Sequence, residues 1–194
     1  MKDVAAADTR NFALIGHSTD GKTSLGEAIL WKAGAIAALG NVTAGTAALT
    51  TLPEEKERQG ASVSTAVYAF DWQGRHLTVV DAPVDTNFQS DGQIALQALD
   101  AAVLVVSAVD GAKVGTERMW RAVGSAGVPS IAFVNGLDRE RADFGAAVES
   151  LRKLGAKPVL LCLPVGIEAE LRGVVDLLTM KAHVGPAESP VPAE

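Results

Sequence analysis

Hydrophobic residues gather in short runs along the chain, and the runs are separated by stretches whose apolar positions recur at helical spacing. The apolar runs are rich in Val, Ile, Leu and Ala and occupy residues 12–16, 77–83, 101–111 and 129–136. The stretches with helical spacing occupy residues 21–36, 90–100, 115–127 and 143–155. Near-continuous apolar runs of this length are typical of strands that are buried on both faces of a parallel sheet. The alternation therefore predicts an α/β fold with helices on a mostly parallel sheet.

Two segments depart from this alternation, and a fifth apolar run continues it. Two strand-like runs between residues 62 and 81 flank the sequence DWQGR, which predicts a β-hairpin and hence one antiparallel edge strand. A further apolar run at 157–166 contains the single cysteine, Cys162, which we expect to be a buried core residue. Residues 36–62 have no convincing strand or helix pattern, so we expect a mobile loop beside a ligand.

Composition and charge restrict the class of protein. The chain has 194 residues, of which 48% are hydrophobic, and its net charge is −6. The negative charge argues against direct DNA binding and against an anionic membrane surface. No stretch approaches the roughly 20 apolar residues of a membrane span, and the first ten residues lack the apolar centre of a signal peptide. We therefore expect a cytoplasmic protein with an N-terminal extension (1–10), one domain (11–184) and a disordered tail (185–194).

The segment that joins the first apolar run to the first helical stretch has the sequence GHSTDGKT and satisfies the phosphate-loop pattern G-x-x-x-x-G-K-[ST]. Backbone N–H groups of such a loop surround phosphate oxygens, and the helix N-terminus adds its positive end. Lys22 would reach the β and γ phosphates, and the Thr23 hydroxyl would coordinate Mg²⁺. A glycine-rich turn without function is the alternative, which the position between strand and helix disfavours. The predicted nucleotide-binding residues are Gly16, His17, Ser18, Thr19, Asp20, Gly21, Lys22, Thr23 and Ser24.

Two carboxylates at the ends of later apolar runs suit the same ligand. Asp81 ends a predicted buried strand, at the sheet edge where ligands bind in open α/β folds, and would hold Mg²⁺. The alternative for Asp81 is a cap on the following turn. Asn135 and Asp138 form N-x-x-D after another strand. A carboxylate beside a purine accepts hydrogen bonds from guanine N1–H and the exocyclic amine, whereas adenine offers no such pair, so Asp138 predicts guanine selectivity.

The motifs GHSTDGKTS, LPEEKERQGASVS, VVSAVDGAKVGTERMWR, FVNGLDRERADF and LRGVVDLLTMKA together resemble the GTP-binding domain of bacterial elongation factor G and its paralogs. The resemblance covers residues 10–182 and implies the three-layer sandwich of phosphate-loop NTPases. It also implies GTP hydrolysis coupled to ribosomal translation, with Ser62 as a Mg²⁺ ligand from the mobile loop and residues 164–184 as the start of an inserted subdomain. The later Ser-Ala motif of the family is not in this sequence, so we expect either a fragment or a truncated product.

Three residues differ from the family pattern. Val84 replaces the glycine of D-x-P-G, and a β-branched residue tolerates few of the backbone angles open to glycine, which argues against normal sensing of the γ phosphate. Asp85 stands where the family commonly has a water-positioning His. It is a weak candidate for a general base, and a solvent-facing Asp in a degraded switch is the favoured alternative. Gly136 replaces the Lys of N-K-x-D, whose stem packs on the base, at a cost of roughly 1–2 kcal/mol in binding.

Three functional hypotheses follow. The first is a GTPase that binds GTP or GDP with Mg²⁺ and acts with the ribosome through the full-length protein. The second is a binding module that retains guanine nucleotide, mainly GDP, without useful turnover. The third is an adenine-specific kinase or ATPase, which Asp138 and the family motifs disfavour.

Overall fold

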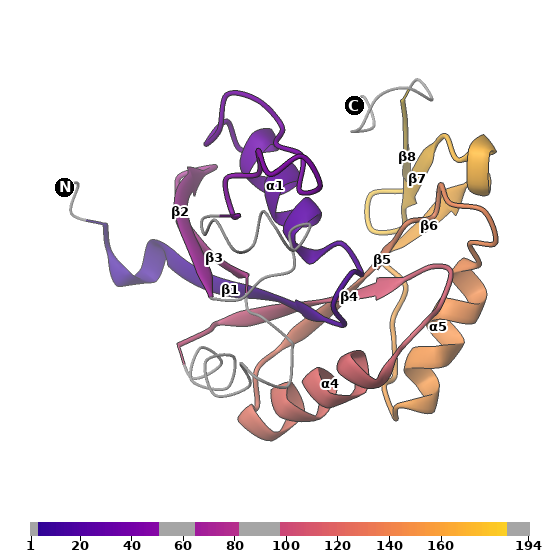
Figure 1. The fold of residues 1–194 in the computed structure, drawn as a ribbon. Helices are drawn as coiled ribbons and strands as arrows, with labels where there is room; N and C mark the ends of the chain where they lie inside the picture. Colours follow the sequence, from indigo (N-terminus) through magenta and orange to yellow (C-terminus); the bar gives the residue numbers. More distant parts are fainter. Residues whose placement is uncertain (1–3, 51–64, 82–97, 186–194) are drawn as a thin grey trace. The chain divides into compact units, whose positions relative to one another are not determined.

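The computed structural model describes residues 4–50, 65–81 and 98–185 of the chain, and the structural statements below concern these residues. The chain divides into two compact units, Met1–Val105 with Lys113–Phe133, and Val106–Ala112 with Val134–Glu194. We describe each unit by itself. The elements are labelled in Figure 1.

The larger sheet has five strands in the spatial order β2-β3-β1-β4-β5. Strand β1 runs parallel to both β3 and β4, whereas β2 pairs with β3 in the antiparallel sense at the sheet edge. The strands are β1 (Thr9–Gly16), β2 (Ala66–Trp72), β3 (Arg75–Asp81), β4 (Ala101–Ser107) and β5 (Ser130–Asn135). The predicted α/β fold with one antiparallel edge strand is therefore confirmed.

The hairpin between β2 and β3 turns at Gln73 and Gly74. Both residues have positive φ, 47° and 77°. Tight hairpins favour such pairs because their twist matches that of the flanking strands. The turn fixes the register that ends with Ala66 opposite Asp81, and so places Asp81 at the last position of β3.

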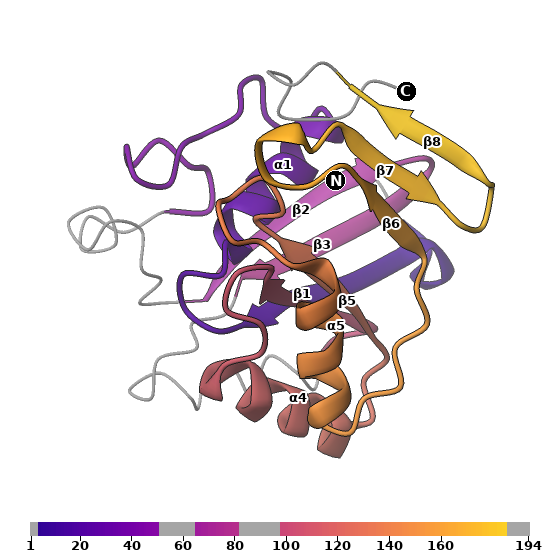
Figure 2. The ribbon, with the colours of Figure 1, turned by 90° about the vertical axis from the view of Figure 1, so that its right-hand side faces the viewer.

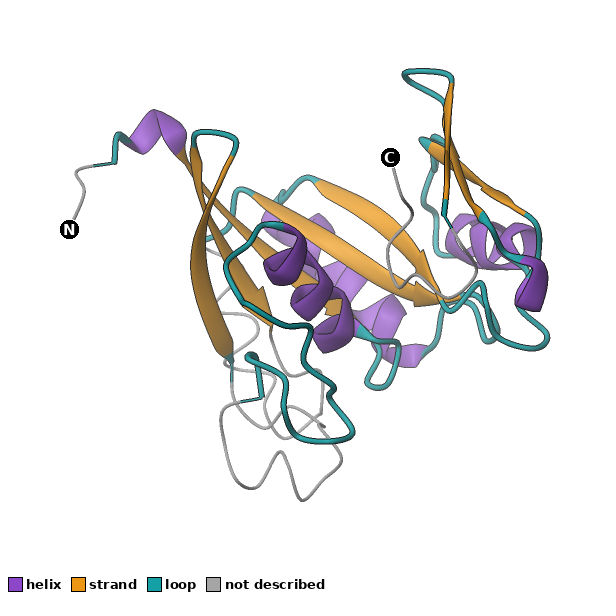
Figure 3. Cartoon of the chain, turned by 90° about the horizontal axis from the view of Figure 1, so that it is seen from above, coloured by secondary structure: helices purple, strands orange, loops and turns teal. Residues whose placement is uncertain are grey.

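Two helices of the first unit, α1 (Lys22–Lys32) and α4 (Val114–Ala126), contact the sheet at β1. They lie on opposite faces of it (Figures 1 and 3). Under α1 the buried core includes Leu14, Leu30 and Val79, each 0% exposed. Apolar strands covered on both faces are what the predicted parallel sheet requires.

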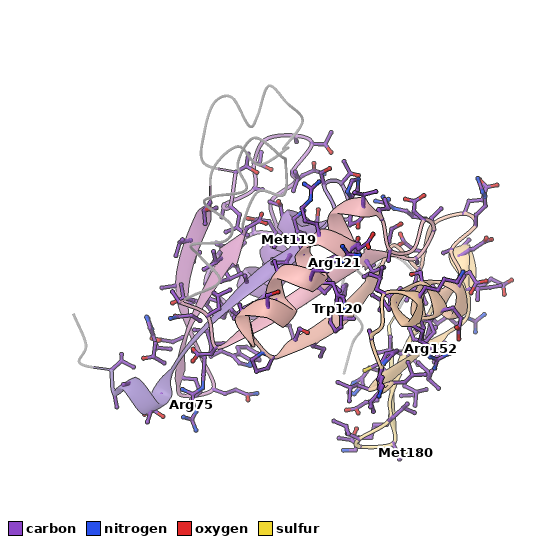
Figure 4. All side chains as sticks on the ribbon, turned by 90° about the horizontal axis from the view of Figure 1, so that it is seen from below. Arg75, Met119, Trp120, Arg121, Arg152 and Met180 are labelled. Carbon is purple, nitrogen blue, oxygen red and sulfur yellow. The ribbon has the colours of Figure 1, made fainter. Side chains whose placement is uncertain are left out.

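Helix α4 is amphipathic. Met119 and Val123 are buried, whereas Arg121 is exposed; Met119 and Arg121 are labelled in Figure 4. Arg121 pairs with Glu117 one turn earlier, at 2.6 Å. The helix ends at Gly127, whose φ of 67° provides the left-handed C-cap that glycine adopts without strain. No helix among the described residues has the length and apolar character that crossing a bilayer would require.

The second unit contains α5 and a small antiparallel sheet in the order β6-β7-β8, seen side by side in Figure 2. The side chain of Asp143 caps α5 by accepting a hydrogen bond from Ala146 N at 2.9 Å. The elements of this unit are α5 (Phe144–Lys153), β6 (Cys162–Val165), the short 3₁₀ helix η3 (Glu168–Glu170), β7 (Gly173–Asp176) and β8 (Lys181–Val184). A second short 3₁₀ helix, η1 (Ala6–Asp8), belongs to the first unit.

Two burial predictions are wrong. The run at 157–166 contributes only the short strand β6, which belongs to the small sheet, and Cys162 is exposed instead of buried. The sequence predicts that β5 is buried on both faces, but Ile131 and Phe133 are 48% and 41% exposed. Apolar composition predicts a strand correctly in both cases, but burial depends on which elements cover it, and the run itself does not specify them.

Candidate nucleotide-binding site

The loop between β1 and α1 is shaped by glycine at both ends. Gly16 has a φ of 137°, and a Cβ there would lie 2.3 Å from the backbone oxygen of Val105 in β4. Gly21 has a φ of 91° and is the N-cap of α1. The first glycine lets the strands approach closely and the second turns the chain into the helix. The segment thus joins a buried strand to a helix N-terminus, the setting that phosphate binding requires.

Lys22 lies in the first turn of α1 and is 7% exposed. Its Nζ donates a hydrogen bond to His17 O at 2.8 Å, so the ammonium group lies against the backbone of the loop. Burial lowers the pKa of Lys22, Asp81 and Asp20 act in the raising direction, and Lys113 acts in the lowering direction. Three charged groups around the loop therefore act on Lys22.

Thr23 and Asp81 are in direct contact. Thr23 Oγ1 donates a hydrogen bond to Asp81 Oδ2 at 2.6 Å, and the two residues are 8% and 0% exposed. A hydroxyl and a carboxylate are the oxygen ligands that Mg²⁺ prefers, and Mg²⁺ usually takes only one or two protein groups beside phosphates and waters. Among the described residues there is no cluster of three or more His, Cys, Asp or Glu suited to a metal ion.

Asn135 and Asp138 belong to the second unit. Asn135 ends β5, and its backbone oxygen accepts a hydrogen bond from Ala108 N at 2.8 Å. Gly136 follows with a φ of 75°, and Asp138 is exposed in the turn after it. The turn is closed by Arg139 N, which donates to Gly136 O at 3.2 Å. The carboxylate of Asp138 is thus presented to solvent by a short turn at a strand end.

The remaining predicted site residues are placed as follows. His17 is half-buried, Ser18, Thr19 and Ser24 are exposed, and Asp20 is buried. The predicted Mg²⁺ ligand Ser62, the weak catalytic candidate Asp85 and the family difference at Val84 lie outside the described residues.

Sequence reasoning missed two sets of contacts near the site: one to the phosphate loop and one to the loop that follows α1. Lys113, at the start of α4, forms an ion pair with Asp20, with Nζ 2.9 Å from Oδ1. A charged residue inside the loop pattern signals that a counter-charge is needed, but it does not identify a partner so distant in sequence. Glu27 in α1 is 1% exposed and accepts hydrogen bonds from the backbone N–H groups of Gly40 and Leu49. It therefore anchors the loop that follows α1.

Comparison with known proteins shows the family to which the chain belongs. Residues 7–184 match the family model described as the elongation factor Tu GTP-binding domain. The chain is 38% identical over 174 residues to elongation factor G of Thermotoga neapolitana, covering 89% of this chain and 25% of that protein. A crystal structure of a protein from Thermus thermophilus superimposes with a TM-score of 0.87 at 34% identity, covering 97% of this chain and 28% of the other. The chain thus spans about a quarter of the length of these relatives.

Proposed function

Because the chain belongs to the family of elongation factor Tu GTP-binding domains and is similar to elongation factor G, we propose that it binds GTP and GDP with Mg²⁺ and hydrolyses GTP in ribosomal translation. The binding residues in this proposal are those of the loop Gly16–Thr23 with Ser24. The ribosome would be engaged by a full-length protein, as in the relatives that the chain spans only in part.

The observation that carries the proposal is the contact between Thr23 and Asp81. It brings the hydroxyl of the phosphate-loop helix and the carboxylate at the end of β3 within 2.6 Å of each other in a buried setting. The same helix turn contains the buried Lys22. A nucleoside triphosphate with its metal ion requires a cation beside the phosphates, and a hydroxyl and a carboxylate beside the metal ion.

Thr23 and Asp81 fit Mg²⁺ by the chemistry of their oxygens, and both would hold it, with Ser62 as a further proposed ligand. Bound there, the ion would neutralise charge on the phosphate oxygens. Lys22 would hold the phosphates by charge-assisted hydrogen bonds, which are about twice as strong as neutral ones. Asn135 and Asp138 would select guanine over adenine.

A retained-nucleotide module is the second candidate, and the sequence itself favours it at two positions. Val84 and Asp85 stand where the family has glycine and commonly His. Loss of those two functions would leave nucleotide binding intact and remove turnover. Single-turnover hydrolysis of radiolabelled GTP, with and without ribosomes, distinguishes the two candidates: release of phosphate above the uncatalysed rate in either condition favours the GTPase.

The binding proposal is tested by calorimetric titration of GDP, GTP and ATP with and without Mg²⁺. We expect GDP and GTP to bind, Mg²⁺ to tighten binding, and ATP to bind far more weakly. Lys22→Ala should abolish binding, whereas the matched control Lys32→Ala, an exposed lysine in the last turn of the same helix, should leave it unchanged. A Lys22→Ala variant that binds GDP as tightly as the parent would show that the phosphate-loop assignment is wrong.

A further inference from the structure

The loop that would receive phosphates contains a carboxylate of its own. Asp20 lies inside the segment Gly16–Thr23, and its side chain is 0% exposed. An anionic ligand is repelled by a fixed negative charge in its binding loop, and the repulsion is strongest where water does not screen it. A phosphate loop with a buried Asp therefore needs a cation beside that Asp.

Lys113 is positioned to be that cation. Its Nζ lies 2.9 Å from Asp20 Oδ1, and its side chain is only 25% exposed. Lys113 is the N-cap residue of α4, and its backbone N–H donates to Thr116 Oγ1 at 3.1 Å. Thr116 is 0% exposed. The start of the helix is thus fixed, and with it the backbone from which the lysine extends.

A second contact brings the same helix turn against the loop. A Cβ at Gly115 would lie 2.6 Å from His17 Nδ1 and 3.0 Å from His17 Cα. The backbone of α4 therefore lies directly against the first variable residue of the loop. Lys113 and Gly115 together place the start of α4 along the loop, and both contacts lie within the first unit.

We propose that Lys113 is a positioning residue of the nucleotide site. It neutralises the buried Asp20, so that the phosphate loop accepts a nucleoside diphosphate or triphosphate. This inference rests on the proposed function, since it concerns the affinity of the same loop for phosphates. Lys113 acts on the ligand through Asp20. Lys22 is the loop cation that would touch the phosphates.

The charges around the loop explain why the pair matters. Lys22 and Lys113 are positive, and Asp20 and Asp81 are negative, so the four groups balance. Removal of the Lys113 charge leaves two carboxylates against one ammonium at a site for anions. Removal of the charge on Asp20 leaves two ammonium groups against one carboxylate, which favours an anion. The two substitutions therefore have opposite effects on nucleotide affinity.

A double-mutant cycle on the 194-residue chain, read by calorimetric titration of GDP, tests the proposal. Lys113→Met should weaken GDP binding by at least about tenfold, because it removes the ammonium group that lies beside a buried carboxylate in the phosphate loop. Adding Asp20→Asn to Lys113→Met should restore the affinity to within about threefold of the parent, since the carboxylate charge that Lys113 offsets is then gone as well. Lys113→Arg keeps the charge and should stay within about threefold.

The outcomes separate this inference from the proposed function. The inference alone is overturned by three results together. The parent binds GDP, Lys22→Ala abolishes that binding, and a folded Lys113→Met variant binds GDP with the affinity of the parent. No binding by the parent would overturn both. Thermal unfolding monitored by circular dichroism shows whether each variant is folded. If Lys113→Met does not fold, Asp20→Asn decides: GDP affinity above that of the parent supports the inference, and affinity equal to or below that of the parent contradicts it.

Discussion

The hydrogen bond between Thr23 and Asp81 joins the helix after the phosphate loop to the end of β3, and both partners are buried. The pair is formed by residues that the sequence places far apart, and each is predicted as a metal ligand from its own motif. Two independent motifs that meet in space are stronger support for a common ligand than either motif alone. The pair also allows the metal to be tested separately from the phosphates.

Asp81→Asn should remove most of the effect of Mg²⁺ on nucleotide affinity. The amide oxygen still accepts the Thr23 hydrogen bond, so the fold is expected to persist, but a neutral amide is a poorer Mg²⁺ ligand than a carboxylate. The measurement is the ratio of GDP dissociation constants with Mg²⁺ and with a chelator, in the parent and the variant. Asp71→Asn on the exposed face of β2 is the control. An unchanged ratio in Asp81→Asn would exclude Asp81 from the metal site.

Asp138→Asn should relax base selectivity more than it lowers affinity for phosphates. The amide presents an N–H₂ group toward guanine N1–H, so guanine loses two hydrogen bonds, worth roughly 2–4 kcal/mol. The measurement is the discrimination between GDP and ADP by calorimetry. Because Asp138 is exposed and caps no helix in the described structure, the variant should fold normally. Discrimination equal to that of the parent would mean that another residue reads the base.

The backbone conformation at position 136 favours glycine, whatever that residue contributes to binding of the base. Its φ is 75°, a conformation that L-residues resist. Gly136→Lys should therefore cost about 1–2 kcal/mol in the free energy of unfolding, measured in urea. The strain is present in the free and the nucleotide-bound chain alike, so restoring the lysine stem that the family places under the base should still tighten GDP and GTP binding by about five- to thirty-fold. Gly124→Ala, in the exposed interior of α4 with open space around it, is the control and should stabilise the chain by about 0.5–1 kcal/mol. Equal stability of Gly136→Lys and the parent would remove the strain argument.

At the scale of secondary-structure elements, α1 organises the residues that follow it as well as the phosphate loop before it. The Glu27 carboxylate accepts from Leu49 N at 2.9 Å and from Gly40 N at 3.2 Å. Leu49 itself packs in the core beside Leu14 and Leu30. The described half of the loop that the sequence suggested to be mobile is thus held to α1 by a buried carboxylate and an apolar side chain.

Glu27→Ala should destabilise the chain by about 2–4 kcal/mol in urea unfolding, because one buried and one part-buried backbone N–H group lose their acceptor. Glu27→Gln keeps one acceptor oxygen and should cost about half as much. The control is Glu149→Ala on α5, an exposed residue whose ion pair with Arg152 should be worth less than about 0.5 kcal/mol. A Glu27→Ala variant as stable as the Glu149→Ala variant would show that Glu27 does not anchor the loop.

The elements also show how far the sequence alone leads. The alternation of apolar runs predicts β1, β3, β4, α1, α4 and α5, because buried parallel strands appear as near-continuous apolar runs and helices as apolar positions at helical spacing. It does not place β6 in a separate small sheet, because an apolar run fixes the strand and leaves the pairing partner open. The phosphate-loop pattern identifies Lys22 and Thr23, but the Asp20–Lys113 pair is a contact between distant segments. Only the folded chain brings such residues together.

At the scale of the whole molecule, GTP and GDP can act as different signals only if they give the chain different conformations. A ligand shifts a conformational equilibrium by no more than its differential affinity for the two states. In the family the glycine of D-x-P-G meets the γ phosphate, and here Val84 takes its place. The sequence therefore predicts that GTP and GDP are bound with nearly the same effect on the protein.

Val84→Gly should restore the difference between the two nucleotides. If the GTP-bound form needs a backbone conformation that a β-branched residue resists, the strain of about 1–3 kcal/mol falls on that form alone. The variant should then bind a non-hydrolysable GTP analogue about 5- to 100-fold more tightly relative to GDP than the parent does. Val80→Ile, a conservative change within strand β3, is the control for altered packing and should leave the ratio unchanged.

Hydrogen exchange reports whether that difference reaches the rest of the chain. In the parent, the amides of residues 36–50 should exchange at the same rates with the analogue and with GDP, because Glu27 holds Gly40 and Leu49 whichever nucleotide is bound. In Val84→Gly the analogue should slow exchange in the segment that continues toward Ser62, and GDP should not. Hydrolysis should stay slow even then, since Asp85 still stands where the family commonly has His. A parent chain that already protects this segment with the analogue and not with GDP would show that Val84 transmits the signal as glycine does, and the proposed uncoupling would be wrong.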